Sequence, residues 1–301
     1  MQDLKVPSYL KAGDCVGVVC PAGEVRKPVT EAVALFRSWG LRVKVGSTVG
    51  HNFFHFSGTD MERTEDLQTM LDDPELKAIF AARGGYGTVR IIDALNFEKF
   101  LERPKWLIGY SDITVLLMHM YNRYRVPSIH GQMPNTIPEA TKASIESLKQ
   151  ALFGIPLHYT YESSSLNRDG VSTGTLIGGN LAILTSIVGS VSDPDYTDKI
   201  LFIEDVGEHH YNIDRMVWML KRAGKFQNLK GLILGGFTAL RDPDSAFGYS
   251  IPEIIMECVK EFNYPVAMDF PAGHIGNHHT LILGMDVRLE VHGPHVSLNY
   301  L

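Results

Sequence analysis

Three polar residues of the types that cleave amide bonds each follow an apolar segment of the chain. Ser111 comes after the run WLIG, Glu204 ends the run LFI, and His274 comes shortly after Phe270. A catalytic triad needs a serine nucleophile, a histidine base and a carboxylate that orients the histidine, and it tolerates any fold that brings them together. The chain order Ser111, Glu204, His274 therefore raises the hypothesis of serine-type acyl transfer.

The segment around Ser111 reads as a strand, a turn and a helix. Its sequence, WLIGYSDIT, places Gly109 and Tyr110 before the serine and Asp112 after it. A serine on such a turn exposes its Oγ, and the N–H of the next residue points to where an oxyanion forms. The second glycine of G-x-S-x-G is missing, so the motif is only half met. The alternative is a plain helix cap made by Ser111 or Asp112.

A glycine-rich turn, RGGYG, follows the apolar run that ends at Ala82. Glycines here allow positive φ angles and a close approach of the backbone, so Gly84 and Gly85 could present N–H groups to an anion. The spacing is not G-x-G-x-x-G, and no P-loop Lys-Ser/Thr follows. A tight turn between a strand and a helix is the alternative, and Gly178-Gly179-Asn180 resembles it.

The acid and histidine segments also allow plainer interpretations. Glu204 and Asp205 end a predicted buried strand, but acids at such positions are often solvated or cap a helix. His274 lies between Gly273 and Ile275, and histidine is the usual general base near neutral pH. A metal site is not expected, because there is no HExxH and no Cys/His cluster with zinc spacing. Adjacent histidine pairs, which occur at 209–210 and 278–279, are expected at the surface.

The elements that must position these residues change character along the chain. In the N-terminal half, short apolar runs alternate with helical patterns, which predicts a parallel sheet wrapped by helices. The pattern lapses in a polar, Ser- and Gly-rich stretch. We therefore expect an N-terminal α/β domain over 1–153, a linker over 154–174 and a C-terminal domain over 175–301. The last stretch alternates like antiparallel sheet.

Composition narrows the class of protein. The chain has 301 residues, 45% hydrophobic and 21% charged, and a formal net charge of -6. A mildly acidic chain lacks the basic footprint of a nucleic-acid binder. No apolar run of membrane-spanning length and no signal peptide is evident. Three cysteines are too few for a disulfide framework, which favours a reducing, cytoplasmic setting.

The order and spacing of several motifs resemble the LD-carboxypeptidase family, which includes the microcin C self-immunity peptidases. The resemblance runs nearly end to end. Its motifs are LKAGD at 10–14, ARGGYG at 82–87, IGYSD at 108–112, His130-Gly131, GTLIGGNL at 174–181, IEDVGE at 203–208, Tyr211, IDR at 213–215 and Gly273-His274.

The resemblance implies a flavodoxin-like N-terminal domain, a β-rich α/β C-terminal domain and an active site between them. It implies release of the C-terminal D-alanine of murein tetrapeptides in peptidoglycan recycling, with Ser111 as nucleophile, Glu204 as carboxylate and His274 as base. Backbone N–H groups of Asp112 and Gly85 would form the oxyanion hole. We further expect Arg83, Gly84, Tyr110 and Asn180 to contact the substrate, no cofactor, and a homodimer.

Two alternatives stay open. The first is a microcin C-type immunity peptidase that acts on peptidyl- or aminoacyl-nucleotide amides. Those relatives tend to have an enlarged loop between nucleophile and acid, for which the spacing of Ser111 and Glu204 leaves little room. The second is a small-molecule binding module without catalysis, against which the intact Ser111, Glu204 and His274 argue.

Overall fold

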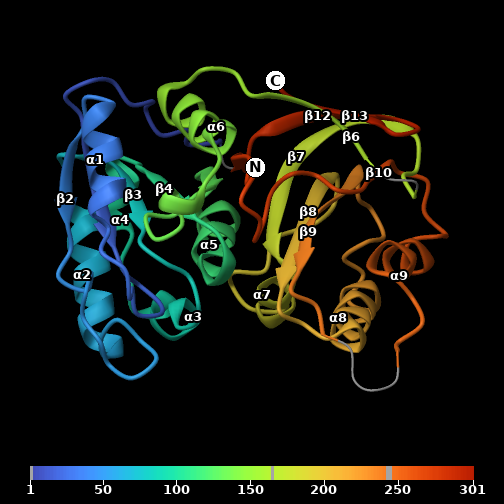
Figure 1. Ribbon diagram of the computed structural model, residues 1–301, viewed down its shortest axis with the longest axis horizontal. Helices are drawn as coiled ribbons and strands as arrows, with labels where there is room; N and C mark the ends of the chain where they lie inside the picture. The colour runs from blue at the N-terminus through green and yellow to red at the C-terminus, as the bar shows by residue number, and fades with distance from the viewer. Residues whose placement is uncertain (1–2, 164–165, 242–245) are drawn as a thin grey trace. The chain divides into compact units, whose positions relative to one another are not determined.

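Strands and helices alternate through the first half of the chain, as the apolar runs predict. The computed structural model describes residues 3–163, 166–241 and 246–301 (Figure 1). It divides into a first unit, residues 1–155 and 276–282, and a second unit, residues 156–275 and 283–301. Each unit contains its own sheet, which gives a mixed α/β fold with two domains.

The first unit is built on a six-stranded sheet with the order β11-β5-β4-β3-β1-β2. Pairs β1–β2, β1–β3, β3–β4 and β4–β5 are parallel, so their carboxyl ends meet at one edge. The strands are β1 (Cys15–Val19), β2 (Arg42–Val45), β3 (Leu76–Ala81), β4 (Trp106–Gly109), β5 (Ser128–His130) and β11 (Leu281–Leu283). Every residue of β1 and β4 is buried, as expected for strands covered on both faces.

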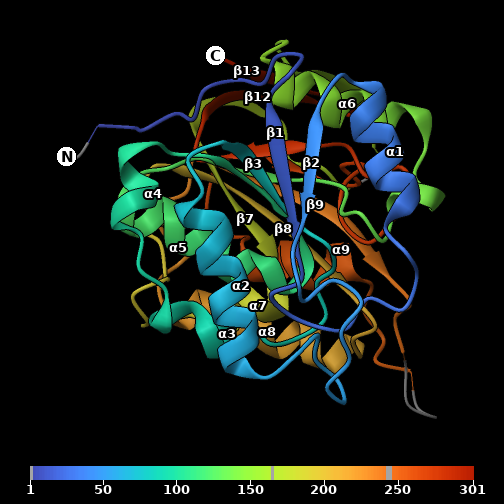
Figure 2. The same cartoon turned by 90° about the vertical axis from the view of Figure 1, so that its left-hand side faces the viewer.

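Helices cover both faces of this sheet. Figure 2 shows α1 and α6 together on one side and α2, α4 and α5 on the other. The helices are α1 (Thr30–Ser38), α2 (Asp60–Asp72), α3 (Thr88–Ile91), α4 (Glu98–Glu102), α5 (Thr114–Tyr124) and α6 (Lys142–Phe153), with 3₁₀ turns at Ile92–Ala94, Ser111–Ile113 and Ile137–Glu139. Their ends follow local rules: a capping box of Thr59 and Glu62 begins α2, and Gly154 in the left-handed region ends α6.

The second unit contains a seven-stranded mixed sheet with the order β10-β9-β8-β7-β12-β13-β6. Strands β7 to β10 are parallel, whereas β12, β13 and β6 pair antiparallel. The strands are β6 (His158–Glu162), β7 (Gly170–Asn180), β8 (Lys199–Val206), β9 (Gly231–Thr238), β10 (Val266–Ala267), β12 (Asp286–His292) and β13 (His295–Tyr300). The helices are α7 (Leu181–Ser186), α8 (His210–Arg222) and α9 (Ile251–Cys258).

The chain path differs from the expected boundaries in two places. The stretch 154–174, expected as a linker, contains β6 and the first part of β7. Residues 276–282, expected in the C-terminal domain, belong to the first unit, where β11 forms the edge of the sheet beside β5. β6 has five residues that alternate in burial and β11 has three, so the local sequence does not show which strand each of them pairs with. None of the helices described is both long and apolar enough to cross a membrane.

Candidate active site

Ser111 lies on a strained turn between β4 and α5. Tyr110 is extended, and Ser111 itself has a φ of 64°, in the left-handed region that residues other than glycine rarely adopt. Such a residue costs about 1–3 kcal/mol and persists only where its surroundings enforce it. Neither Ser111 nor Asp112 caps the helix that follows with its side chain. The turn therefore has the backbone of a nucleophile elbow rather than that of a plain helix cap.

Gly84 provides the space that this turn needs. A Cβ added to Gly84 would lie 2.8 Å from the Cβ of Ser111 and 3.1 Å from its Oγ. Real Cβ atoms do not approach this closely, so any larger residue would push the serine out of place. Gly84, predicted to contact substrate, thus has a direct steric role beside the serine.

One hydrogen bond joins the glycine turn to the serine turn, and another joins the glycine turn to Gly23. The carboxylate of Asp112 is buried and accepts from the N–H of Thr88 at 2.8 Å, just after the turn. The carbonyl of Gly84 accepts from the N–H of Gly23 at 3.0 Å. Gly85 has a φ of 100° and is exposed, and its N–H donates to no residue that the structure describes. The two predicted oxyanion donors, Asp112 and Gly85, thus lie on connected turns.

Arg63, which no sequence motif singles out, is hydrogen-bonded to the backbone of this region. Its side chain is fully buried and donates to the carbonyls of Pro21 at 2.5 Å and Gly87 at 3.0 Å. It also pairs with Asp60 at 2.5 Å. A buried guanidinium needs several acceptors to offset its desolvation, and here three of them are loop carbonyls, since Nε also donates to Gly58 at 3.3 Å. One side chain thereby fixes the end of the glycine turn.

Arg83 is a cation that forms no ion pair with any residue of the described ranges. Its Nη1 donates to the carbonyl oxygen of Glu24 at 2.5 Å, and the side chain is half-buried. The carboxylate of Glu24 instead accepts from Arg26, at 2.6 Å, and from Asn52. Arg83 therefore retains donors beside Gly84 that an incoming anion could use.

Glu204 and His274 form a buried pair in the second unit. The His274 Nδ1–H donates to Glu204 Oε2 at 2.7 Å; the Glu204 side chain is fully buried and the His274 side chain is 19% exposed. A carboxylate in this position fixes the tautomer of the imidazole and stabilises its protonated form. Proton exchange with a reacting group would then go through Nε2.

Gly273 makes the pair possible. Its φ is 110°, and an added Cβ would lie 2.8 Å from Glu204 Oε2. The hydroxyl of Thr238, on β9, donates to the carbonyl of His274 at 3.1 Å and fixes the backbone on the other side. Glu204 Oε1 is buried without a hydrogen-bond partner among the residues described. Burying a carboxylate oxygen without a hydrogen-bond partner costs stability, and such carboxylates occur at functional sites.

Asp205 and Asn180 form hydrogen bonds next to this pair, and the predicted contact of Asn180 with substrate stays a prediction. Asp205 accepts from Asn180 Nδ2 at 3.0 Å and from the N–H of Ala182 at 2.9 Å, and Asn180 Oδ1 caps α7 by accepting from Ile183. Burial and, to a lesser extent, the neighbouring charge of Glu204 raise the pKa of Asp205 to about 6, although its hydrogen bonds oppose this shift. Because both polar atoms of Asn180 are engaged within the unit, we assign it to positioning α7.

The histidine pair at 278–279 differs from expectation. His278, expected at the surface, is fully buried, because residues 276–282 pack into the first unit. The ring of His278 contacts that of Tyr110, which is 5% exposed. Tyr110 therefore has a packing role, and its contact with substrate stays a prediction.

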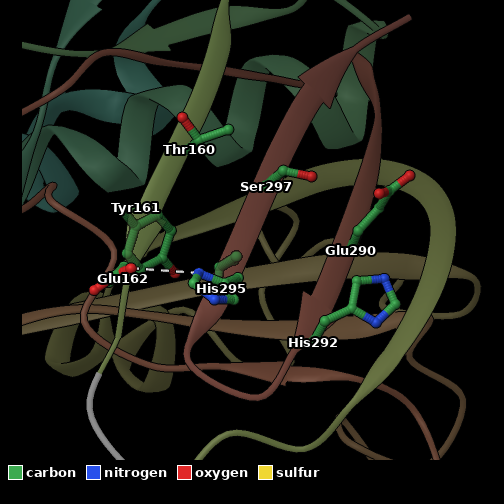
Figure 3. Close-up of a pocket in the computed structure, with 8 residues that line it drawn as sticks. Thr160, Tyr161, Glu162, Glu290, His292, His295 and Ser297 are labelled. Atoms are coloured by element: carbon green, nitrogen blue, oxygen red, sulfur yellow. Dashed lines mark ion pairs between the residues drawn. The ribbon is translucent and has the colours of Figure 1, made fainter.

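The structure thus brings the predicted residues together in two groups, one in each unit. A pocket of about 420 Å³ on β6, β12 and β13 contains none of them (Figure 3). Its Glu162–His295 ion pair, at 3.4 Å, joins two exposed side chains and contributes little. No group of three or more His, Cys, Asp or Glu among the described residues could hold a metal ion.

Models of a known family match both units. Residues 16–131 match the LD-carboxypeptidase N-terminal domain, and residues 173–289 match the LD-carboxypeptidase C-terminal domain. The chain belongs to the LD-carboxypeptidase family. It is accordingly a hydrolase, a carboxypeptidase of the serine type.

Individual members of the LD-carboxypeptidase family resemble the chain over nearly its whole length. A Bacillus subtilis protein named "Probable murein peptide carboxypeptidase" is 34% identical over 89% of this chain and 86% of its own. The crystal structure of muramoyltetrapeptide carboxypeptidase from Oxalobacter formigenes superposes with a TM-score of 0.86, at 27% identity, over 95% of this chain and 98% of that one. The microcin C7 self-immunity protein of Escherichia coli is 26% identical over 96% of this chain and 94% of its own.

Proposed function

We propose that this LD-carboxypeptidase releases the C-terminal D-alanine of murein tetrapeptides. The bond cleaved would be the amide between the L-centre of meso-diaminopimelate and D-alanine. One observation carries the proposal: a chain of this family holds a serine in a strained elbow and a histidine on a fully buried glutamate. Both arrangements cost stability, and acyl transfer by a serine needs both.

We assign Ser111 as the nucleophile and His274 as the base. Ser111 Oγ attacks the scissile carbonyl while His274 Nε2 takes its proton, and Glu204 stabilises the imidazolium that forms. His274 then protonates the nitrogen of the leaving D-alanine. Water, activated by the same histidine, hydrolyses the acyl-enzyme and regenerates Ser111. This chemistry requires Ser111 Oγ and His274 Nε2 to come within hydrogen-bond reach during catalysis.

We assign the oxyanion hole to the backbone N–H groups of Asp112 and Gly85. The exposed, positive-φ Gly85 and the elbow at Ser111 are linked through Gly84 and through the Asp112–Thr88 hydrogen bond. Donors that are fixed before the reaction stabilise developing charge without reorganising, and one of them is worth about 10²–10³ in turnover.

The free carboxylate of the substrate needs a cationic partner, and Arg83 suits that role. It has no ion pair among the residues that the structure describes, and it directly precedes Gly84 in the turn beside Ser111. A guanidinium binds a carboxylate with two parallel hydrogen bonds, so Arg83 would select substrates that end at the cleaved residue.

The deciding experiment compares D-alanine release from purified murein tetrapeptide by the wild type and by Ser111→Ala. Release by the wild type alone supports both the reaction and the nucleophile. Release by both proteins would overturn the assignment of Ser111. Release by neither protein would overturn the proposal that murein tetrapeptide is the substrate.

A second candidate substrate is a peptidyl- or aminoacyl-nucleotide amide, which the similarity to the microcin C7 self-immunity protein favours. The same three side chains would serve, since the bond broken is again an amide. Hydrolysis of such a compound at a higher kcat/KM than the tetrapeptide would make it the preferred assignment.

We further propose a cytoplasmic homodimer, as the resemblance to the family implies. The three cysteines are buried and free, which suits a reducing compartment. Light scattering on the purified protein tests the dimer, and fractionation of the cells that make it tests the location. A monomer at micromolar concentration would contradict the first, and recovery outside the cytoplasm the second.

A further inference from the structure

A buried histidine that the mechanism does not use contacts the residue immediately before the proposed nucleophile. His278 is fully buried, and its ring meets that of Tyr110 edge-on, with centroids 4.6 Å apart and planes at 78°. Tyr110 is the residue immediately before Ser111, and only three residues separate His278 from His274. His278 is thus the first buried residue after His274 in the chain, and it contacts the residue immediately before Ser111.

His278 is held in place by a second buried histidine. A hydrogen bond of 3.2 Å joins His278 Nε2 to His130 Nδ1, and His130, at the end of β5, is also fully buried. This hydrogen bond restrains the orientation of the His278 ring, because the N–H of one imidazole and the lone pair of the other both point outward in their ring planes. The His130-Gly131 motif, for which the triad chemistry has no role, thereby acquires one.

The helix α6 binds the segment around His278 through one polar face. Thr141, Ser144 and Ser147 recur every three residues and therefore lie on the same side of the helix. The N–H of Thr141 donates to the carbonyl of Gly276 at 3.2 Å, the Ser144 hydroxyl to the carbonyl of His278, and the N–H of Thr280 to the Ser147 hydroxyl at 3.0 Å. The backbone on both sides of His278 is therefore fixed.

We propose that His278 is a positioning residue for the nucleophile. The left-handed backbone of Ser111 persists only if its neighbours enforce it. The glycine turn contacts Ser111 itself, the Asp112–Thr88 hydrogen bond holds the residue after it, and His278 holds Tyr110, the residue before it. The inference rests on the proposed role of Ser111 and adds a residue that acts through Tyr110.

Three substitutions of His278 separate the ring contact from the hydrogen bond. His278→Ala removes both and should lower kcat for D-alanine release about 10²-fold with little change in KM, the loss typical of a nucleophile displaced by about 1 Å. His278→Phe keeps a ring against Tyr110 and should recover most of kcat but melt at a lower temperature. His278→Gln keeps a donor without a ring, so it should retain more stability than the Phe variant and less kcat.

His119 offers a matched control, because it is a buried histidine of the same unit that packs on Phe97 and Tyr124 instead. His119→Ala should lose stability while kcat per folded molecule stays at the wild-type value. Wild-type kcat in folded His278→Ala, or equal kcat in the Phe and Gln variants, would overturn the inference.

The rate at which a fluorophosphonate labels Ser111, followed by mass spectrometry, gives a readout that needs no peptide. If the wild type releases no D-alanine but is labelled, the proposed substrate fails. The labelling rates of the three variants, in the same order as predicted for kcat, would still support the positioning role, and equal rates would refute it.

Discussion

Ser111 lies in the left-handed backbone region against a glycine, whereas Glu204 lies on the buried strand β8, where the pairing register with β9 shifts, and is held by its hydrogen bond to His274. The first unit therefore positions Ser111 by steric fit against Gly84, with strain in the backbone. The second unit prepares its half of the chemistry by electrostatics, with a carboxylate removed from water. The first half should respond most to a change of volume at Gly84. The second should respond most to a change of charge at Glu204, although it also depends on the space that Gly273 leaves.

The largest effect is expected where the charge is removed. Glu204→Gln keeps the shape of the side chain but cannot stabilise the imidazolium of His274 and no longer enforces its tautomer, so kcat should fall about 10⁴-fold. Steady-state release of D-alanine measures this. Glu253→Gln, which alters an exposed acid at the start of α9, is the control. A loss of less than about tenfold would mean that charge is not what the second unit contributes.

A change of volume should break the first half nearly as strongly. Gly84→Ala places a methyl group 2.8 Å from the Ser111 Cβ, and the displaced serine should lose about 10²–10³-fold in kcat. Gly13→Ala is the control in the same unit: its φ is 92°, but nothing lies within 4 Å of the added atom. That variant should lose some stability and keep kcat. Equal activities in both variants would contradict a steric role for Gly84.

The pH dependence of stability gives a further test of electrostatics in the second unit, through Asp205. Burial raises the pKa of Asp205 from 3.8 to about 6, so the folded protein retains a proton that the unfolded chain has released. Stability should therefore fall by up to about 3 kcal/mol as pH rises from about 4 to about 6. In Asp205→Asn this component is absent. Denaturant unfolding of both proteins at several pH values measures it, and a pH-independent difference between them would argue against it.

The smallest effect is expected at Arg83. This residue is proposed to bind the substrate, and it prepares neither Ser111 nor His274 for the reaction. Arg83→Ala should raise KM about tenfold and leave kcat nearly unchanged, because a charge-assisted hydrogen bond to substrate is lost. Arg83→Lys keeps the charge without the fork and should fall in between. Unchanged kinetics in both variants would remove Arg83 from the substrate site.

Much of the fold could be predicted because its signals are local. The buried runs of β1, β3 and β4 and the helices between them show clear periodicity, and the family match confirms the α/β assignment with two domains. The strand β6 was missed, since a short strand at an edge with polar alternate residues resembles a loop. What decides such segments is pairing with a distant strand, which no window of sequence contains.

The candidate site divides in the same way. The types and order of Ser111, Glu204 and His274 are visible in the sequence, and their roles stay a prediction. The clash that requires Gly84, the burial of Arg63 and the contact of His278 with Tyr110 arise only from tertiary packing. The hydrogen bonds of Asn180 to Asp205 and to the start of α7 are likewise invisible in the sequence, and its contact with substrate stays a prediction.

The path of residues 276–282 has a consequence for biosynthesis. The first unit takes its edge strand β11 from a part of the chain that the ribosome adds only after most of the second unit. At about 5–20 residues per second, the roughly 120 residues in between take on the order of ten seconds to emerge. During that interval β5 has an unpaired edge, and a nascent chain with such an edge is open to wrong pairing and to chaperones. Completion of the unit that contains Ser111 thus waits until most of the second unit has been translated.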